Sequence, residues 1–265
     1  MNNIKNNPNL ENKYLQQDFF NENINDLKIK NQLKIMPISV LEISAQKKRT
    51  GNRLDSSRSG FSPFAEEVSD ICYEFYLRDS KNVFDPFAGW GERAEKAKEW
   101  NKNYIGFDTS KDAIMSAKKK GFDNVLANSL FDEIPKHDGL ITCPPYWNLE
   151  KYSGNGIDQT KTWEDFIYQY TEIWKRCYEK AEIDSTYCIM VGEWRKNHVF
   201  YDLEYITRKA FKELGATLFD QVVISRKLVS KVTVMMPQAK RLGYSVRVHE
   251  SLLIFKKQHE KKIGA

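Results

Sequence analysis

The chain has 265 residues, of which 41% are hydrophobic and 13% aromatic, so it can bury the core of one large domain or two small ones. Its four cysteines show no Cys-x-x-Cys spacing, which argues against a disulfide framework and against a zinc site. The sequence lacks both a signal core and the run of about 20 apolar residues that a membrane helix needs. We therefore expect a soluble, intracellular protein, in the cytoplasm or in a eukaryotic nucleus.

The net charge of +5 is distributed unevenly. Ten Lys or Arg stand against two Glu between Arg226 and Lys262, and a second basic run, KKRTGNR, occupies residues 47–53. A solvated face explains either run alone equally well. Two such runs that flank one folded core favour a polyanionic partner, because Lys and Arg release counterions when they neutralise phosphates.

Residues 1–60 are expected to form an N-terminal arm that is only partly ordered and is basic at 47–53. The beginning of this segment is rich in Asn and has little apolar periodicity. Residues 61–257 are expected to form the folded domain, and residues 258–265 a C-terminal tail.

From Phe61 onward, the spacing of apolar residues predicts regular elements. Ser62 and Pro63 precede FAEEVSDICYEFYL, which is typical of a capped amphipathic helix. The predicted strands after it are KNVFDP, NYIGFD, NVLAN, GLITCPP and TYCIMVGEW, and the helices between them are ERAEKAKEW, SKDAIMSAKKK, TWEDFIYQYTEIWKRCYEKA and YDLEYITRKAFKEL. This alternation predicts an α/β domain with a mostly parallel sheet and helices on both faces. The last β-rich segments, LFDQVVISR and ESLLIFKK, have no predicted helix between them and are expected to pair as an antiparallel hairpin.

The first strand runs into a turn with two glycines, VFDPFAGWGER. Gly89 and Gly91 lie at the carboxyl end of a parallel strand, where open α/β sheets bind ligands. A tight strand–helix turn needs glycine in any case, so this motif alone is a weak signal. The next strand ends at Asp108, about 20 residues later, where a carboxylate can accept hydrogen bonds from both hydroxyls of a ribose.

These segments favour a nucleoside ligand that has no pyrophosphate. Ala94 stands where the dinucleotide fingerprint prefers its third glycine, which weakens a dinucleotide hypothesis without excluding it, and no Gly-Lys-Ser/Thr loop is present. S-adenosylmethionine fits this description. Asn128 and Ser129 follow the third strand, where an adenine edge is read, although a polar strand end explains them equally well.

The segment ITCPPYWN, residues 141–148, ends an apolar strand with two prolines. Proline has no N–H and a fixed φ, so the strand stops here and the turn is stiff. Tyr146 and Trp147 are expected to be exposed beyond it.

In this order, FDPFAGWG, YIGFD and TCPPYWNLEKYS resemble the amino-methyltransferases that modify bases of DNA, and most closely the phage or mobile-element type of DNA methylase. A Gly-Glu-x-Arg strand end (Gly192–Arg195) and a final His-x-x-x-Leu-x-Phe strand (His249–Phe255) add to the resemblance, which covers roughly residues 35–257. It implies a Rossmann-like class I methyltransferase fold with a seven-stranded sheet. It also implies methyl transfer from S-adenosylmethionine to adenine N6 or cytosine N4 of a base in DNA, duplex or locally opened, that is swung out of the stack.

The resemblance also assigns roles to individual residues. The cofactor is expected to contact Phe61, Ser62, Pro63, Asp85, Pro86, Phe87, Ala88, Gly89, Gly91, Asp108, Asn128 and Ser129, with Trp90 lining the cleft. The substrate is expected to contact Trp147, Glu193, Trp194, Arg195, Lys240, Arg241 and Arg247. No metal is expected. A plain helix N-terminus explains residues 61–63 nearly as well, and a core position explains Trp194 equally well. For His249 and Glu250 the favoured role is a pair that joins the hairpin, and a substrate contact is the alternative.

The expected catalytic turn consists of Cys143, Pro144, Pro145 and Tyr146. An exocyclic amine is a poor nucleophile because its lone pair is delocalised into the ring. A rigidly held Pro144 carbonyl can accept one amino hydrogen while side chain 143 accepts the other. Stacking on Tyr146 is worth ~1–3 kcal/mol, comparable with the few kcal/mol that unstacking costs. Positioning and electrostatics then carry the reaction without a covalent intermediate.

Cys143 departs from the family pattern, which has Asp, Asn or Ser at this position, because a thiol is a weak acceptor. The favoured interpretation is a tolerated small polar residue. A nucleophilic thiolate, as in pyrimidine C5 methylation, and an inactive site in a binding subunit remain open. Asp at this position tends to accompany adenine and Ser cytosine, so Cys143 leaves the base undecided, with a weak preference for adenine.

The basic insert at residues 227–248 is short. Its cations can contact phosphates, but it offers little surface for reading base edges. We therefore expect a short or relaxed target site, or recognition supplied in part by the arm or by a second subunit. A non-catalytic nucleic-acid-binding subunit and an RNA base methyltransferase are the alternative functions.

Overall fold

The computed structural model describes residues 38–43, 64–149, 152–226 and 230–258. All of them belong to the compact unit from Pro37 to Ala265. The expected arm therefore lies outside the described residues except for its part 38–43, and the expected tail lies outside except for Gln258.

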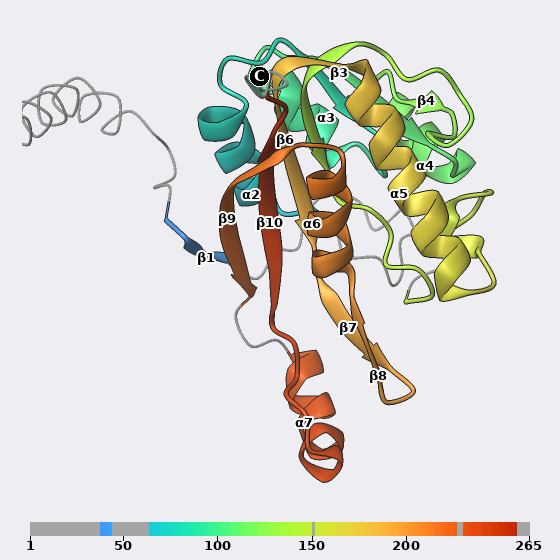
Figure 1. The fold of residues 1–265 in the computed structure, drawn as a ribbon, viewed down its shortest axis with the longest axis vertical. Helices are drawn as coiled ribbons and strands as arrows, with labels where there is room; N and C mark the ends of the chain where they lie inside the picture. The colour runs from blue at the N-terminus through green and yellow to red at the C-terminus, as the bar shows by residue number, and fades with distance from the viewer. Residues whose placement is uncertain (1–37, 44–63, 150–151, 227–229, 259–265) are drawn as a thin grey trace, which may run out of the picture. The chain divides into compact units, whose positions relative to one another are not determined.

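The described residues contain one sheet of eight strands (Figure 1). Its members are β1 (Val40–Ile43), β2 (Asn82–Asp85), β3 (Asn103–Asp108), β4 (Val125–Leu126), β5 (His137–Thr142), β6 (Ala181–Val191), β9 (Thr217–Arg226) and β10 (His249–Lys256). They lie in the order β1-β9-β10-β6-β5-β2-β3-β4. Only β10 runs antiparallel to its neighbours, β6 and β9, so the sheet is mostly parallel and contains the predicted hairpin. The predicted fold class is confirmed.

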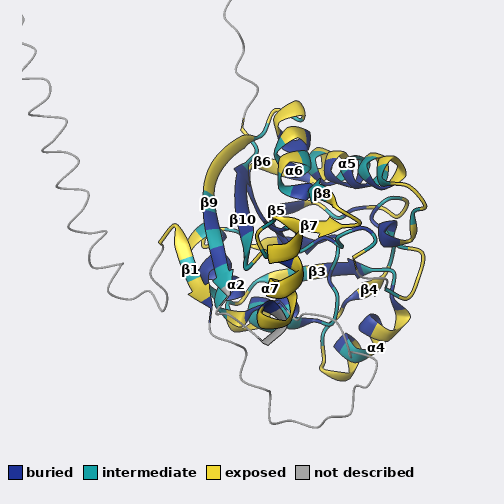
Figure 2. Cartoon of the chain, turned by 90° about the horizontal axis from the view of Figure 1, so that it is seen from below, coloured by how far each residue is buried: buried dark blue, intermediate teal, exposed yellow. Residues whose placement is uncertain are grey.

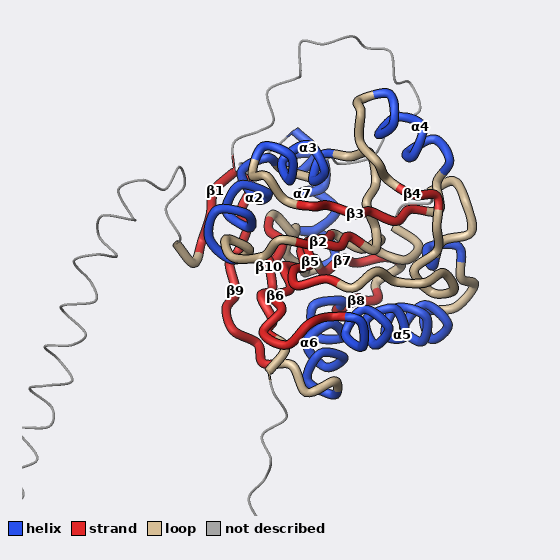
Figure 3. The backbone as a smooth tube through the Cα atoms, turned by 90° about the horizontal axis from the view of Figure 1, so that it is seen from above, coloured by secondary structure: helices blue, strands red, loops and turns tan. Residues whose placement is uncertain are grey.

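The helices cover both faces of the sheet. They are α2 (Glu66–Ile71) with its π-helical continuation η2 (Cys72–Tyr76), α3 (Glu92–Glu99), α4 (Lys111–Lys119), the 3-10 turn η3 (Ile157–Gln159), α5 (Trp163–Lys180), α6 (Leu203–Glu213) and α7 (Ser230–Leu242). Figure 3 shows α2, α3 and α4 on one face and α5 and α6 on the other. The first helix begins at Glu66, after an extended Ala65, and therefore later than the Ser62-Pro63 pair predicts.

Four elements differ from the sequence prediction. β1 pairs in parallel with β9, so a part of the expected arm adds an eighth strand to the seven that were expected. The antiparallel pair β7 (Glu193–Lys196) and β8 (Val199–Asp202) follows β6 directly. Helix α7 lies between β9 and β10, where no helix was predicted, because Pro237 inside it obscures the helical pattern. Figure 2 shows α7 largely exposed and β6 and β10 mostly buried.

The core lies between α5, α6 and the central strands. The apolar sides of α5 and α6 carry rings that pack on β6 and β10, and Phe211 and Phe255 are stacked with 4.3 Å between ring centroids. Thr162 caps α5 by accepting from the Asp165 amide, and the Pro-free run that follows it continues for 18 residues. This packed layer holds the carboxyl ends of the parallel strands in fixed positions.

His137, the first residue of β5, is a buried titratable group in this core. Its Nδ1 lies 2.9 Å from the Pro135 carbonyl oxygen, and among the described residues its Nε2 has no hydrogen-bond partner. Burial lowers the pKa of His137. Below the unfolded-state pKa of about 6.5 the unfolded chain therefore binds more protons than the folded chain.

The free energy of unfolding is accordingly expected to fall as the pH drops below about 6.5, with a contribution from His137 that approaches about 1.4 kcal/mol per pH unit. His137→Phe, which suits the neighbouring Phe84 and Tyr187 rings, is expected to flatten this dependence. Chemical denaturation of both proteins between pH 7.5 and pH 5 measures the difference. Equal pH slopes in the two proteins would contradict it.

Candidate functional site

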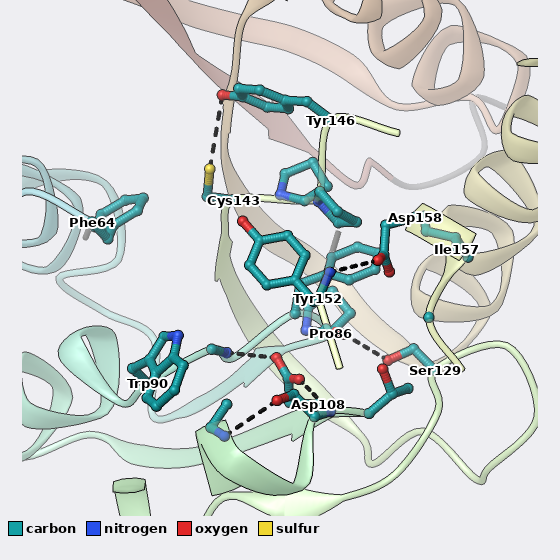
Figure 4. Close-up of a pocket in the computed structure, with 18 of the residues that line it drawn as sticks. Phe64, Pro86, Trp90, Asp108, Ser129, Cys143, Tyr146, Tyr152, Ile157 and Asp158 are labelled. Carbon is teal, nitrogen blue, oxygen red and sulfur yellow. Dashed lines mark hydrogen bonds between the residues drawn. The ribbon is translucent and has the colours of Figure 1, made fainter. Parts of the chain in front are cut away.

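A pocket opens at the carboxyl ends of β2, β3, β4 and β5 (Figure 4). It encloses about 1230 Å³ when the solvent at its open mouth is included. The expected residues that line it are Pro86, Phe87, Gly89, Trp90, Asp108, Asn128, Ser129, Cys143, Pro144, Pro145 and Tyr146. Segments about 60 residues apart in sequence, the glycine turn and the Pro-Pro turn, thus face one cavity. Phe61, Ser62 and Pro63 lie outside the described residues, and the next residue, Phe64, lines the pocket.

Asp108 ends β3 with its carboxylate in the wall of the pocket. One carboxylate oxygen accepts a hydrogen bond from the Gly89 amide and the other from the Ser110 amide, both at 2.8 Å. Burial raises the pKa of Asp108, and the two backbone N–H groups oppose this rise. A carboxylate has about four acceptor positions, so Asp108 has capacity for further donors from a ligand.

The polar residues after β4 support the pocket mainly through the backbone. Ser129 donates to the Pro86 carbonyl at 2.9 Å. Asn128 accepts from the Leu130 amide at 2.9 Å and donates to the Asn155 carbonyl at 3.3 Å. These bonds join the loop after β4 to the glycine turn and to the segment that follows the Pro-Pro turn.

Asp85 lies beneath the pocket and not in its wall. It is 0% exposed and accepts from four groups on four different segments. The donors are the Phe87 amide at 3.1 Å, Arg93 Nε at 2.6 Å, the Tyr104 hydroxyl at 2.7 Å and the Thr142 hydroxyl at 2.6 Å. Asp85 thus joins the glycine turn to the end of β5. Its expected contact with the cofactor stays a prediction.

Two further expected cofactor residues also lie behind the pocket wall. Ala88 is buried, and its amide donates to the Phe107 carbonyl at 2.8 Å. Gly91 begins α3 with a φ of +92°, and a Cβ at this position would stand 3.0 Å from the Phe122 ring. Glycine is therefore needed here because of the positive φ and the close packing, as in any tight strand–helix turn, whether or not a ligand binds.

The Pro-Pro turn presents Tyr146 to the pocket. Its hydroxyl donates to Glu250 Oε1 at 2.7 Å and lies 3.9 Å from Cys143 Sγ. Burial is the largest cause that raises the pKa of Tyr146 well above its ordinary value, and the nearby Cys143 and Glu250 raise it further. The hydroxyl therefore stays protonated. One face of the ring stacks on Trp194, with 5.7 Å between centroids and an interplanar angle of 12°.

Trp147, expected to be exposed beside Tyr146, is instead 8% exposed and does not line the pocket. Its φ of +43° turns the side chain back toward the core, where Nε1 donates to the Thr160 carbonyl at 3.3 Å. Its ring packs at 5.6 Å from Trp163 and 5.4 Å from Tyr201. The predicted exposure of Trp147 is thus wrong, because its side chain points away from Tyr146 and packs in the core. Its expected contact with the substrate stays a prediction.

Three residues that are expected to contact the substrate, Glu193, Trp194 and Arg195, lie on β7 of the β7–β8 hairpin. Trp194 is 5% exposed and belongs to the same aromatic cluster, so it occupies the core position that was the alternative to a substrate contact. Glu193 pairs with Arg247 at 3.4 Å. Arg195 and Arg247 both lie over the Phe200 ring, at 5.2 and 4.8 Å from its centroid. None of these four residues lines the pocket.

The hairpin and α7 extend beyond the end of the sheet that carries the pocket (Figure 1). Lys240 and Arg241 are exposed on the last turn of α7. Val234, Met235 and Met236 on the same helix are exposed as well, Val234 to 78%. The cations that are expected to contact the substrate therefore lie on elements that extend from the pocket end of the sheet. They do not line the pocket itself.

Sequence reasoning missed part of the wall of the pocket. Tyr152 and Asp158 line it and are joined by a 2.9 Å hydrogen bond from the Tyr152 amide (Figure 4). Ser153 reaches Ser110 at 2.7 Å between their hydroxyl oxygens. Glu250 was not missed, because a substrate contact was the alternative to its predicted role in the hairpin, and it lines the pocket as well.

The described part of the chain contains no group of three or more His, Cys, Asp or Glu that could hold a metal ion. None of its helices combines the length and the hydropathy that crossing a membrane requires.

Solved structures resemble this fold. TrmN from Thermus thermophilus superposes with a TM-score of 0.50 at 13% sequence identity, over 73% of this chain and 49% of TrmN. The N-methyltransferase NodS from Bradyrhizobium japonicum WM9 gives a TM-score of 0.49 at 14% identity, over 73% of this chain and 96% of NodS. The chain thus spans about half the length of TrmN. No protein-family model and no curated protein matches the sequence. At 13% identity the likeness to TrmN establishes the fold alone, that of an α/β domain with a mostly parallel sheet.

Proposed function

We propose that the chain transfers a methyl group from S-adenosylmethionine to an exocyclic amine of a DNA base, with adenine N6 weakly preferred over cytosine N4. The observation that carries this proposal is a single pocket lined by both Asp108 and the Cys143–Tyr146 turn. A carboxylate suited to a ribose and a stiff turn suited to an amino group thus share one cavity at the carboxyl edge of a methyltransferase fold.

The residues present fit this cofactor. Asp108 would hold the ribose hydroxyls, the loop with Asn128 would contact the adenine, and the glycine turn would lie beside the methionine part. Among the described residues no phosphate-binding Gly-Lys-Ser/Thr turn is found, which suits a nucleoside without a pyrophosphate. When bound, S-adenosylmethionine supplies an activated methyl group on a positively charged sulfur.

The Pro-Pro turn then positions the base. Pro144 is buried and lines the pocket. Its carbonyl would accept an amino hydrogen of the base. Tyr146, braced from behind by Trp194, offers a ring for stacking. Thr142, which precedes the turn, is fixed by its 2.6 Å bond to Asp85. The chain supplies rigid orientation, which is the main requirement when no covalent intermediate forms.

A transfer assay tests the proposal. Wild-type protein is incubated with radiolabelled S-adenosylmethionine and random-sequence unmethylated acceptors: duplex DNA, single-stranded DNA and RNA. Label in DNA is expected, and mass spectrometry of the digested nucleosides then identifies the base. Cofactor binding without label in any acceptor would support the non-catalytic subunit instead.

An RNA base methyltransferase is the second candidate. It is favoured by the small size of the recognition elements among the described residues, namely the 13-residue α7 and the β7–β8 hairpin. A duplex reader needs an element that fills the major groove and reaches several base edges. Label in RNA alone would decide for this candidate.

Asp108→Asn is expected to weaken S-adenosylmethionine binding about tenfold or more, because hydrogen bonds to charged groups are worth roughly 1.5–3 kcal/mol. Isothermal titration calorimetry measures the Kd. Asp138→Asn is the matched control, since Asp138 also accepts from two backbone amides, those of Lys81 and Asn82, but does not line the pocket. Equal Kd values for the two variants would contradict the role of Asp108.

A further inference from the structure

Position 143 leaves the proposed reaction short of one acceptor. A thiol accepts hydrogen bonds weakly, so Cys143 adds little to the Pro144 carbonyl in holding an amino group. A methylated amine must also release a proton. The part of the pocket next to Cys143 therefore needs a stronger base from outside the tetrapeptide.

Glu250 is a carboxylate in that part of the pocket. It is the second residue of β10, which pairs with β6, and it lies beside Gly192, the residue that follows β6. A Cβ at position 192 would stand 3.2 Å from Glu250 Cγ and 3.4 Å from the Tyr146 hydroxyl. The absence of a side chain at Gly192 thus leaves room for the Glu250 and Tyr146 side chains together.

Contacts connect Glu250 to the Pro-Pro turn. Tyr146 donates to Glu250 Oε1 at 2.7 Å, and the same hydroxyl lies 3.9 Å from Cys143 Sγ. The carboxylate and the thiol therefore flank one phenol group. A carboxylate has about four acceptor positions, and the bond from Tyr146 uses one of them.

We propose that Glu250 supplies the acceptor that position 143 lacks, by accepting an amino hydrogen of the base and then taking up its proton. The inference rests on the proposed function. In the balanced step, the amine lone pair forms the N–C bond to the methyl carbon, and the electron pair of the breaking C–S bond stays on sulfur. One N–H proton passes to the Glu250 carboxylate and from there to water.

The competing role is purely structural, in which Glu250 only holds Tyr146 in place. The two roles differ in their response to Tyr146→Phe, which removes the hydrogen bond and keeps the ring. If Glu250 acts on the substrate, this variant loses less activity than Glu250→Gln. If Glu250 only positions Tyr146, Glu250→Gln loses no more activity than Tyr146→Phe, because the Gln amide oxygen can still accept from the Tyr146 hydroxyl.

The experiment compares kcat for label transfer to the acceptor that wild-type protein methylates. Glu250→Gln is expected to lower kcat about 100-fold, in the range for an acid–base group or a charge-stabilising contact, with an unchanged Kd for S-adenosylmethionine. Cys143→Asp, which places a carboxylate at the tetrapeptide position, is expected to restore at least about tenfold in the Glu250→Gln background. Glu182→Gln, at the opposite end of neighbouring β6, is the matched control.

The outcomes separate this inference from the proposed function. Wild-type label with a Glu250→Gln kcat within about twofold of wild type would overturn the role of Glu250 alone. A loss in Glu250→Gln no larger than that in Tyr146→Phe, without rescue by Cys143→Asp, would overturn it as well. No label with wild-type protein would overturn the proposed function, and this inference with it. If Glu250→Gln does not fold, as judged by thermal unfolding, Glu250→Asp keeps the charge on a shorter side chain and is expected to lower kcat about tenfold. A kcat equal to wild type in that variant would also overturn the role.

Discussion

Asp85→Asn is expected to lower the free energy of unfolding by about 3–5 kcal/mol, the usual cost of removing one partner from a buried ion pair. The Arg93 guanidinium would keep its buried place, 2.6 Å from an amide in place of a carboxylate. The hydroxyls of Tyr104 and Thr142 would compete for the single remaining oxygen acceptor. Because these donors come from three segments, the loss is expected to loosen the glycine turn and the start of the Pro-Pro turn together.

Chemical denaturation measures this loss. Glu133→Gln is the matched control, because it removes an exposed ion pair with Lys180 at 3.3 Å. Such pairs contribute about 0–1 kcal/mol. A change below about 1 kcal/mol in Asp85→Asn would show that the four donors find other partners, and that Asp85 does not organise the site.

Tyr146→Ala is expected to reduce methyl transfer by roughly 5- to 150-fold, the equivalent of the ~1–3 kcal/mol that aromatic stacking on a base contributes. The substitution removes the ring that faces the pocket and the donor to Glu250, while Trp194 remains packed against Trp163 and Tyr201. S-adenosylmethionine binding is expected to stay unchanged, since Asp108 and the glycine turn hold it. The fall should therefore appear in transfer and not in cofactor affinity.

Label transfer and calorimetry on the same preparation separate these effects. Tyr168→Ala is the control, because Tyr168 is 71% exposed on α5 and does not line the pocket. Undiminished transfer by Tyr146→Ala would remove the stacking role. A weaker cofactor affinity equal to the fall in transfer would assign Tyr146 to the cofactor instead.

Short-range patterns were sufficient to predict much of this molecule. Alternating strand and helix periods predicted the parallel sheet, and Asp108 and the Pro-Pro turn could be assigned to the same sheet edge because parallel strands end together. By contrast, α7 was missed because Pro237 interrupts its pattern, and β1 because an edge strand of four residues has little period of its own. The hydrogen bonds of Asp85 could not be predicted, since its place in the motif does not show which donors reach its carboxylate.

The sequence by itself determined the alternation of strands and helices from β2 to α6, apart from the β7–β8 pair. It also determined the stiffness of the Pro-Pro turn and the pairing of a glycine turn with a distant acid, because these follow from local periodicity and backbone chemistry. Only the tertiary structure decided that Trp147 is buried, that Asp85 lies beneath the pocket and that Glu250 reaches Tyr146. Those facts depend on which side chains meet across strands more than 50 residues apart, such as Asp85 with Thr142 and Tyr146 with Glu250. Contacts of this kind are set by packing and burial, which no local pattern records.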